Sequence, residues 1–265
     1  MKQSAFQRVA IEASTLLLTL LVLIGVLCGR PVMAAAPGAD TVVGLHIQLK
    51  DTALSDVYEK VFADEIEICT FLKRSVEPLP AGAKVQETSF DRYYVPGAVT
   101  TYIVSKTYSY PINQSCKLVQ RTEEKITIEV TGGFCNANPQ KMVAVGKCKI
   151  PLAQLSQRLT RPRLPFAGVA TGQTRVIAGE GCAVYEQDLQ KILWRWCFAK
   201  KEFAGGLATG VSGAPGAPLS EKVFSGNDPS KPMVALEAIK IEDDTPIPVN
   251  ILLPQLFGNY RLMGG

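Results

Sequence analysis

The chain has 265 residues, of which 28 are Lys or Arg, 24 are Asp or Glu, seven are Cys and one is His. A formal net charge of +4 is too small to mark a nucleic-acid-binding protein, so we expect no nucleic-acid partner. With a single histidine and no CxxC pair, a zinc site is disfavoured, and the sequence predicts no metal and no cofactor.

The N-terminal 34 residues have the layout of a secretory signal peptide. Basic residues precede an apolar run from Thr15 to Cys28, and small residues around Ala34 provide a cleavage site. The run is shorter than the roughly 20 apolar residues of a membrane-spanning helix, although an uncleaved anchor is the alternative. We expect cleavage near Ala34, membrane contact only through this transient segment, and a periplasmic or secreted protein formed by residues 35–265.

Two segments show the apolar periodicity of a helix. In Asp51–Phe62 apolar side chains recur at i, i+3, i+4, i+7 and i+8, which predicts one buried stripe, and Asp51 or Thr52 is suited to cap the helix. The residues of this stripe are Leu54, Val57, Tyr58, Val61 and Phe62. A second, shorter helix is predicted to begin at Pro151, since proline is favoured at the first helical position. Its apolar stripe consists of Leu152, Leu155 and Leu159.

Most of the remaining sequence is typical of β-strand, because β-branched and aromatic residues are frequent and alternate with polar ones. The first predicted strand, Val42–Lys50, contains His46. We interpret His46 as a strand histidine that pairs with an ordinary structural partner. Further strands are predicted at Val99–Tyr110, Cys116–Val130 and Lys141–Ile150, in the hairpin Val176–Ala199 and at Val234–Glu242. An antiparallel sheet with few helices, a mainly β fold of α+β type, is the economical architecture.

Two irregular stretches interrupt this pattern. Arg158–Gly168 combines prolines with arginines and is predicted to be either a crossover loop or a domain boundary. Residues 35–265 are expected to form a single domain, with a boundary near residues 160–170 as the alternative. Ala204–Pro218 is nearly all Gly, Ala, Pro and Ser, so it is expected to form a flexible surface loop. Asn113–Ser115 matches a glycosylation sequon in a predicted turn, which matters only in a glycosylating host.

Cleavage of the leader removes Cys28 and leaves six cysteines, an even number that predicts three disulfides in an exported protein. The expected pairs are Cys182–Cys197, Cys135–Cys148 and Cys69–Cys116. The first pair falls nearly opposite across a hairpin turn predicted at Gln187–Gln190, the second flanks another predicted turn, and the third remains by elimination. Six cysteines allow 15 pairings, so the set is a hypothesis.

Alternation along the second strand of this hairpin separates its side chains into two faces. Trp194 and Trp196 point the same way, together with Tyr185 of the partner strand, whereas Arg195 points to the opposite face, beside the disulfide. The tryptophan face is apolar throughout. A packed core is the favoured interpretation, and the wall of an apolar ligand cavity or an exposed stacking platform are the alternatives.

The segment Thr171–Phe203, TGQTRVIAGEGCAVYEQDL followed by RWCFAKKEF, resembles a strand motif of bacterial periplasmic domains of the lipoprotein-carrier, incomplete β-barrel type. The C-terminal segment from Ala238 through Ile247–Pro248 to Leu253–Pro254 is similar to the closing strand and tail of those domains. The resemblance covers about a third of the chain. It implies a curved antiparallel sheet or incomplete β-barrel with one or two helices, whose concave apolar face holds lipids or acylated partners.

The resemblance also implies candidate ligand contacts. Trp194, Trp196 and Tyr185 would lie on the concave face. Tyr102 and Tyr108 are further candidates, although the sequence does not fix which way their strand faces.

We therefore expect an exported, non-catalytic binding or carrier protein for a lipid or another hydrophobic ligand. A structural or protein-interaction subunit of the bacterial cell envelope, with a solid core, is the first alternative. The second is a carboxylate-dependent hydrolase, because glycosidase chemistry needs two carboxylates about 5 to 10 Å apart. Acidic residues cluster at Asp64–Glu67, Glu123–Glu124 and Asp243–Asp244. No GxSxG motif accompanies His46, so serine-hydrolase chemistry is not expected.

Overall fold

The computed structural model of the protein describes residues 40–51, 53, 55–111, 116–157, 166–203, 214–225 and 228–264. The sequence-based expectations that lie outside these residues stay predictions. Among them are the signal peptide with its cleavage site near Ala34, Thr52 as a helix cap, the sequon at Asn113 and most of the stretch Arg158–Gly168.

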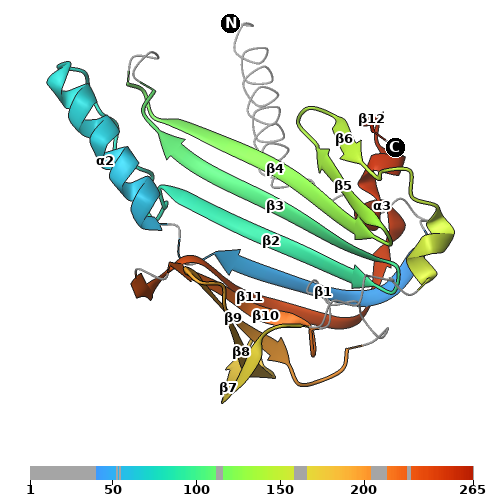
Figure 1. Cartoon of the computed structure of the whole chain (residues 1–265). Helices are drawn as coiled ribbons and strands as arrows, with labels where there is room; N and C mark the ends of the chain where they lie inside the picture. The colour runs from blue at the N-terminus through green and yellow to red at the C-terminus, as the bar shows by residue number, and fades with distance from the viewer. Residues whose placement is uncertain are drawn as a thin grey trace, which may run out of the picture. The chain divides into compact units, whose positions relative to one another are not determined.

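Twelve strands form one curved, open sheet, which confirms the predicted mainly β fold (Figure 1). The strands stand in the order β12-β6-β5-β4-β3-β2-β1-β11-β10-β9-β8-β7, and all neighbours are antiparallel except β12 and β6. The strands are β1 (Thr41–Asp51), β2 (Gln86–Val95), β3 (Ala98–Ser109), β4 (Val119–Val130), β5 (Gly133–Asn138), β6 (Val143–Gly146), β7 (Val169–Ile177), β8 (Glu180–Asp188), β9 (Ile192–Ala199), β10 (Pro218–Ser225), β11 (Asp228–Pro248) and β12 (Arg261–Met263).

β1 lies in the middle of the sheet, between β2 and the long strand β11. Its alternating sequence suits that place, because Leu45, Ile47 and Leu49 are fully buried on one face while His46 on the other face is partly exposed. The chain meanders outward from β1 to β6 and returns from β7 to β11, so strands from both ends of the chain pair at the centre. One hydrophobic cluster joins the two halves, from Leu45 on β1 to Val184 on β8.

The helix predicted at Asp51–Phe62 begins later and continues further, because α2 spans Ser55–Phe71. Asp51 does not cap the helix but ends β1, where its carboxylate accepts a hydrogen bond from the N–H of Ala53 at 2.9 Å. α2 contacts β2 and β3 near one end of these strands (Figure 1). The C-terminal half of α2 was outside the predicted range because Asp64–Glu67 interrupts the apolar pattern.

The structure describes three side chains of the predicted helical stripe, those of Tyr58, Val61 and Phe62. The predicted burial of Val61 is wrong. Phe62 is buried and Tyr58 packs beside it, as expected. Val61 is 51% exposed, because the buried stripe of α2 continues through Ile66 to Cys69 and leaves Val61 at its side.

The second predicted helix is a single 3₁₀ turn, η2, at Leu152–Ser156. Pro151 precedes this turn as its N-cap instead of being its first residue. Leu155 is buried but Leu152 is 46% exposed, so η2 is too short to bury the predicted stripe, and Leu159 lies outside the described residues. Two further short helices, α3 (Val249–Leu252) and α4 (Pro254–Phe257), follow β11.

The strand predicted at Lys141–Ile150 is reduced to β6. Gly146, at its end, has φ of +101°, which only glycine adopts readily, and the chain turns there toward Cys148. Residues 204–213 of the predicted flexible loop lie outside the described residues, whereas Ala217 near its end is buried and Pro218 begins β10. The sequence patterns also leave β2, β5, β10 and β12 unpredicted, and of β7 they include only Val176 and Ile177. The predicted hairpin strand beginning at Val176 is wrong there, because the chain turns between Ile177 and Glu180.

All three predicted disulfides are present, each within a different hydrophobic cluster. The six cysteines are at most 2% exposed. Three intramolecular disulfides fit a protein of an oxidising compartment, extracellular or periplasmic. In the part of the chain that the structure describes, no helix combines the length and the apolar character needed to cross a membrane.

Gly97, in the turn between β2 and β3, is closely approached by the backbone of η2. Its N–H donates to the carbonyl of Leu155 at 2.9 Å, and a Cβ at this position would lie 1.7 Å from the carbonyl oxygen of Gln154. Gly97→Ala is therefore expected to displace η2 and to lower the free energy of unfolding by about 1–3 kcal/mol, the usual range for overpacking. Urea unfolding followed by circular dichroism measures the loss. Gly181→Ala is the matched control, because open space surrounds Gly181, and equal urea midpoints for both variants would contradict the expectation.

Candidate functional site

The β8–β9 hairpin places its aromatic side chains as the sequence predicts. Tyr185 lies opposite Trp196, so these two side chains share a face with Trp194. Arg195 lies opposite Glu186 on the other face, where its Nε is 2.6 Å from the Glu186 carboxylate. The consecutive side chains of Trp194, Arg195 and Trp196 are therefore divided between the two faces of the sheet.

The register of this hairpin differs from the predicted one. The chain reverses at Leu189–Lys191 instead of Gln187–Gln190, so Cys182 lies opposite Ala199 and not opposite Cys197. The disulfide joins diagonal neighbours on one face, whose Cα atoms are 5.4 Å apart. The pairing was predicted correctly because diagonal cross-strand neighbours are also close.

The tryptophan face is closely packed by its own rings. Trp194 and Trp196 stack with centroids 5.5 Å apart. Phe166 makes edge-to-face contacts with Tyr185, Trp196 and Phe198 at centroid distances between 5.3 and 5.8 Å. Trp196 is only 5% exposed. Such mutual packing is what a core requires, and ligand binding by Trp194, Trp196 and Tyr185 stays a prediction.

Tyr102, another candidate, lies against the C-terminal segment. Its hydroxyl donates to the carbonyl of Ile251 at 2.8 Å, and its ring meets Tyr93 edge-on with centroids 5.9 Å apart. Burial raises the pKa of Tyr102, with smaller contributions from Tyr93 and Tyr260. Its side chain thus helps to fasten α3 to the sheet, and its role as a ligand contact stays a prediction.

A pocket of about 450 Å³ opens between α2 and strands β2–β4. Ligand pockets in proteins typically measure about 300–1,000 Å³, so this one can take a small ligand. The apolar part of the lining is Tyr58, Val61, Phe62, Val85, Tyr108 and Pro111. The polar part comes mainly from the strands and is formed by Glu65, Gln86, Ser105, Thr107, Ser109, Arg121 and Glu123. We name this cavity the α2 pocket.

Two polar side chains of the α2 pocket have defined environments. The carboxylate of Glu65 accepts a hydrogen bond from the N–H of Tyr110 at 2.7 Å, which ties α2 to the end of β3. Gln86 donates through Nε2 to Thr88, while its Oε1 is buried and has no donor among the residues that the structure describes. A buried acceptor without a donor is costly, but a ligand in the pocket reaches this oxygen only if the amide of Gln86 turns toward the pocket. The hydroxyl of Tyr108 donates to Gln120 at 3.2 Å.

His46 links the three central strands of the sheet. Its Nδ1 lies 2.7 Å from Glu242 on β11 and its Nε2 lies 2.9 Å from Asp91 on β2, while the ring stacks on Tyr93 with centroids 4.4 Å apart. Two carboxylate acceptors require both nitrogens to donate, which favours the imidazolium form. Burial lowers the pKa of His46, but hydrogen bonds with Asp91 and Glu242 and the charges of both carboxylates outweigh it, so the pKa is raised.

The phenol of Tyr93 belongs to the surroundings of His46. Burial, followed by the charges of Asp91 and Glu242, raises the pKa of Tyr93 to about 12, so its phenol stays neutral beside the imidazolium. Among the described residues, no three His, Cys, Asp or Glu side chains are grouped so that they could hold a metal ion. We name the assembly of His46, Asp91 and Glu242 the central clamp.

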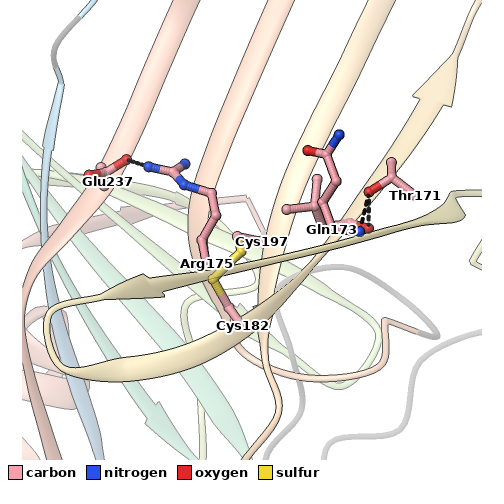
Figure 2. The surroundings of a disulfide bond; sticks show 7 residues. Thr171, Gln173, Arg175, Cys182, Cys197 and Glu237 are labelled. Atoms are coloured by element: carbon pink, nitrogen blue, oxygen red, sulfur yellow. Dashed lines mark hydrogen bonds and ion pairs between the residues drawn. A yellow bond between two sulfur atoms is a disulfide. The ribbon is translucent and has the colours of Figure 1, made fainter.

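The disulfide face of the β8–β9 hairpin carries a second, smaller pocket. Figure 2 shows Arg175 of β7 beside the Cys182–Cys197 bridge, with its guanidinium directed at Glu237 of β11. The pocket measures about 240 Å³, and Arg195 also contributes to it. Sequence alternation placed Arg195 beside the disulfide, but it gave no sign that Arg175 and Glu237 would join it.

Comparison with known proteins leaves the family open. No family model matches the chain, and a search of curated proteins finds no significant match. The resemblance to lipoprotein-carrier domains therefore depends on the sequence motifs alone. Of the residues lining the α2 pocket, Tyr108 was a ligand-contact candidate, and Glu65 and Glu123 belong to two of the acidic clusters considered for hydrolase chemistry. The apolar stripe of α2 was a usable signal for one wall, but the opposite wall involves β2, which the patterns did not predict.

Proposed function

We propose that the protein is an exported, non-catalytic binding or carrier protein whose ligand is a lipid or another amphiphile. The observation that carries the proposal is the α2 pocket. Its apolar lining, with Tyr58, Phe62 and Tyr108, suits a hydrocarbon chain or ring. Its polar lining offers the guanidinium of Arg121 and the amide of Gln86 to a headgroup. A ligand with one apolar and one polar end uses both parts of this lining.

Export is part of the proposal. A signal peptide cleaved near Ala34 would deliver residues 35–265 to the periplasm or the outside of the cell. The three buried disulfides support this route, because they form and persist in oxidising compartments. The resemblance of Thr171–Phe203 to periplasmic carrier domains supports it independently.

A second candidate, a protein-interaction subunit of the cell envelope, is favoured by the C-terminal end of α2. Ile68, Phe71 and Leu72 form an exposed apolar ridge there, and Phe71 is 85% exposed. Exposed apolar side chains grouped in one place are typical of docking surfaces. The ridge and the α2 pocket share one helix, so single substitutions can separate the two candidates.

Native mass spectrometry of the protein, purified from the exported fraction without detergent, is the first test. A carrier is expected to retain an adduct of a few hundred daltons, as for one lipid or small amphiphile, that organic solvent removes. In parallel, binding of a dansyl-labelled fatty acid is measured by fluorescence. Val61→Arg places a charge at the lining of the α2 pocket and is expected to weaken this binding about tenfold or more, equivalent to at least 1.4 kcal/mol.

Phe71→Arg is the matched control for this experiment. Both residues are exposed on α2, so neither substitution should disturb folding, but Phe71 does not line the pocket. The carrier proposal expects normal fatty-acid binding by Phe71→Arg. No adduct, no fatty-acid binding and loss of a co-purifying envelope protein in Phe71→Arg alone would overturn it in favour of the interaction subunit.

A further inference from the structure

Strands β7–β11 curl over the Cys182–Cys197 disulfide. Four inter-strand spacings separate β7 from β11, so the two strands would be about 19 Å apart in a flat sheet. Arg175 on β7 nevertheless reaches Glu237 on β11, with 3.0 Å between its Nη2 and the carboxylate (Figure 2). The curl encloses the pocket of about 240 Å³ described above, which we name the curl pocket.

Positive charge gathers in the curl pocket. Three of its lining residues are cationic and come from three strands, namely Arg175, Arg195 and Lys222. Two carboxylates accompany them, because Glu237 pairs with Arg175 and Glu186 pairs with Arg195. Lys222 has no carboxylate within ion-pair distance among the residues that the structure describes. One positive charge of the pocket is therefore uncompensated.

The location of Lys222 adds to this imbalance. It lies directly opposite Arg195 in the ladder between β10 and β9, and like charges at directly opposite positions destabilise a sheet. Its sequence neighbour Glu221 does not relieve the repulsion, because it points to the other face, where it pairs with Arg92 at 3.7 Å. An anion held between Lys222 and Arg195 would convert this repulsion into two charge-assisted contacts.

Neutral donors complete the lining. Ser220 is 3% exposed and lies opposite Cys197, and Gln173 contributes from β7 (Figure 2). Guanidinium and ammonium groups with hydroxyl and amide donors are the set with which proteins bind oxyanions. The three cations exceed the two neighbouring carboxylates by one charge, so the pocket suits an anion. A phosphate monoester has three terminal oxygens, one more than a carboxylate, and can accept from each of the three cationic side chains.

We propose that the curl pocket is a binding site for a phosphate monoester, held by Lys222, Arg195 and Arg175. The volume of the pocket leaves room for a small organic group beside the phosphate. The phosphate belongs either to a soluble small molecule or to a lipid headgroup. The site is distinct from the α2 pocket, with which it shares no lining residue, and it does not depend on the proposed function.

Isothermal titration calorimetry of the purified protein with glycerol phosphate tests the site. Lys222→Gln is expected to weaken binding about tenfold, the effect of losing one charge-assisted hydrogen bond. Lys191→Gln is the control for net charge, because Lys191 is exposed in the turn of the same hairpin and does not line the pocket. Glu186→Gln removes the carboxylate that competes for Arg195 and is expected to tighten binding several-fold.

Opposite effects of Lys222→Gln and Glu186→Gln would support the proposal, since a purely structural role of these residues predicts no gain of affinity. Vesicles with phosphatidic acid form a second arm, in which binding to vesicles alone identifies a lipid headgroup and binding to free glycerol phosphate alone identifies a soluble ligand. The proposal is overturned if neither probe binds, if Lys222→Gln binds like the unmodified protein, or if Glu186→Gln weakens binding. Fatty-acid binding at the α2 pocket should be unchanged in all these variants.

Discussion

Replacing Cys69 and Cys116 together by serine is expected to lower the free energy of unfolding by about 4 kcal/mol, the chain-entropy value for a bridge of this span. The two cysteines are 47 positions apart in the sequence, the longest loop closed by any of the three bridges. Both are fully buried in the cluster that fastens α2 to the sheet, together with Phe62 and Tyr110. Urea unfolding followed by circular dichroism measures the loss.

The same double variant is expected to lose fatty-acid binding under conditions in which the sheet is still folded. Among the described side chains of α2, Phe62 and Cys69 are the buried ones, and Tyr58 and Ile66 pack partly buried beside them, so loss of the bridge removes one of few anchors of the helix. If α2 detaches, the α2 pocket loses its apolar wall. Fluorescence of the dansyl-labelled fatty acid reports this directly, and loss of helical signal before the main unfolding transition would report detachment.

The control is the double replacement of Cys135 and Cys148, whose bridge spans 13 positions and lies in a different cluster. It is expected to cost about 3 kcal/mol by the same model and to leave fatty-acid binding unchanged. Retained binding with an intact helical signal would show that α2 is held without its disulfide. Retained binding after early loss of the helical signal would contradict the proposed position of the ligand.

The local features of the fold could be predicted because they depend on short segments. Side-chain alternation in β9 assigns Trp196 and Arg195 to opposite faces without knowledge of any other strand. Two disulfide pairs followed from an even number of cysteines and from nearby turns, and Cys69–Cys116 followed by elimination. The exact register of the β8–β9 hairpin did not follow, because the turn at Leu189–Lys191 contains no glycine or proline to mark it, and Gln190 adopts a positive φ there.

The sites could not be predicted because they depend on pairings between distant segments. The α2 pocket needs β2, whose sequence QETSFDRYYV mixes charged and aromatic residues and gives a weak strand pattern. The curl pocket needs Arg175 to meet Glu237, 62 positions away in the sequence. The central clamp joins His46 to Glu242, 196 positions away. A lone histidine in an alternating strand predicts a partner, but it does not identify which carboxylates provide it.

Stability is expected to fall as the pH rises from 6 to 9, because the central clamp requires a protonated His46. The pKa of His46 is raised above 6.5 in the folded protein, so its contribution is complete below 6.5 and is lost as the pH rises through the raised value. Lys240 first, and then His46, lower the pKa of Glu242 below 4.5 by hydrogen bonding, so its contribution is lost as the pH falls through that lowered value. The clamp therefore stabilises most between 4.5 and 6.5.

His46→Gln separates this clamp from other titrating groups. Glutamine can donate to one of the two carboxylates but cannot carry the charge, so the variant is expected to lose about 2 kcal/mol at pH 6, in the range of a hydrogen bond between charged groups. Above the raised pKa the unmodified protein loses the same charge, and the two stability curves should converge. The clamp thus predicts a difference that depends on pH and not merely a weaker protein.

Titration of the imidazole by proton NMR gives the decisive measurement, because His46 is the only histidine and its signal needs no assignment by mutation. A pKa above 6.5, together with urea midpoints that fall toward pH 9 only in the unmodified protein, would establish the clamp. A pKa at or below 6.5 would mean that burial outweighs the two carboxylates. In that case Asp91 and Glu242 would flank a neutral ring that can donate to only one of them, and the three central strands would be held by their backbone ladders and the buried side chains of β1 instead.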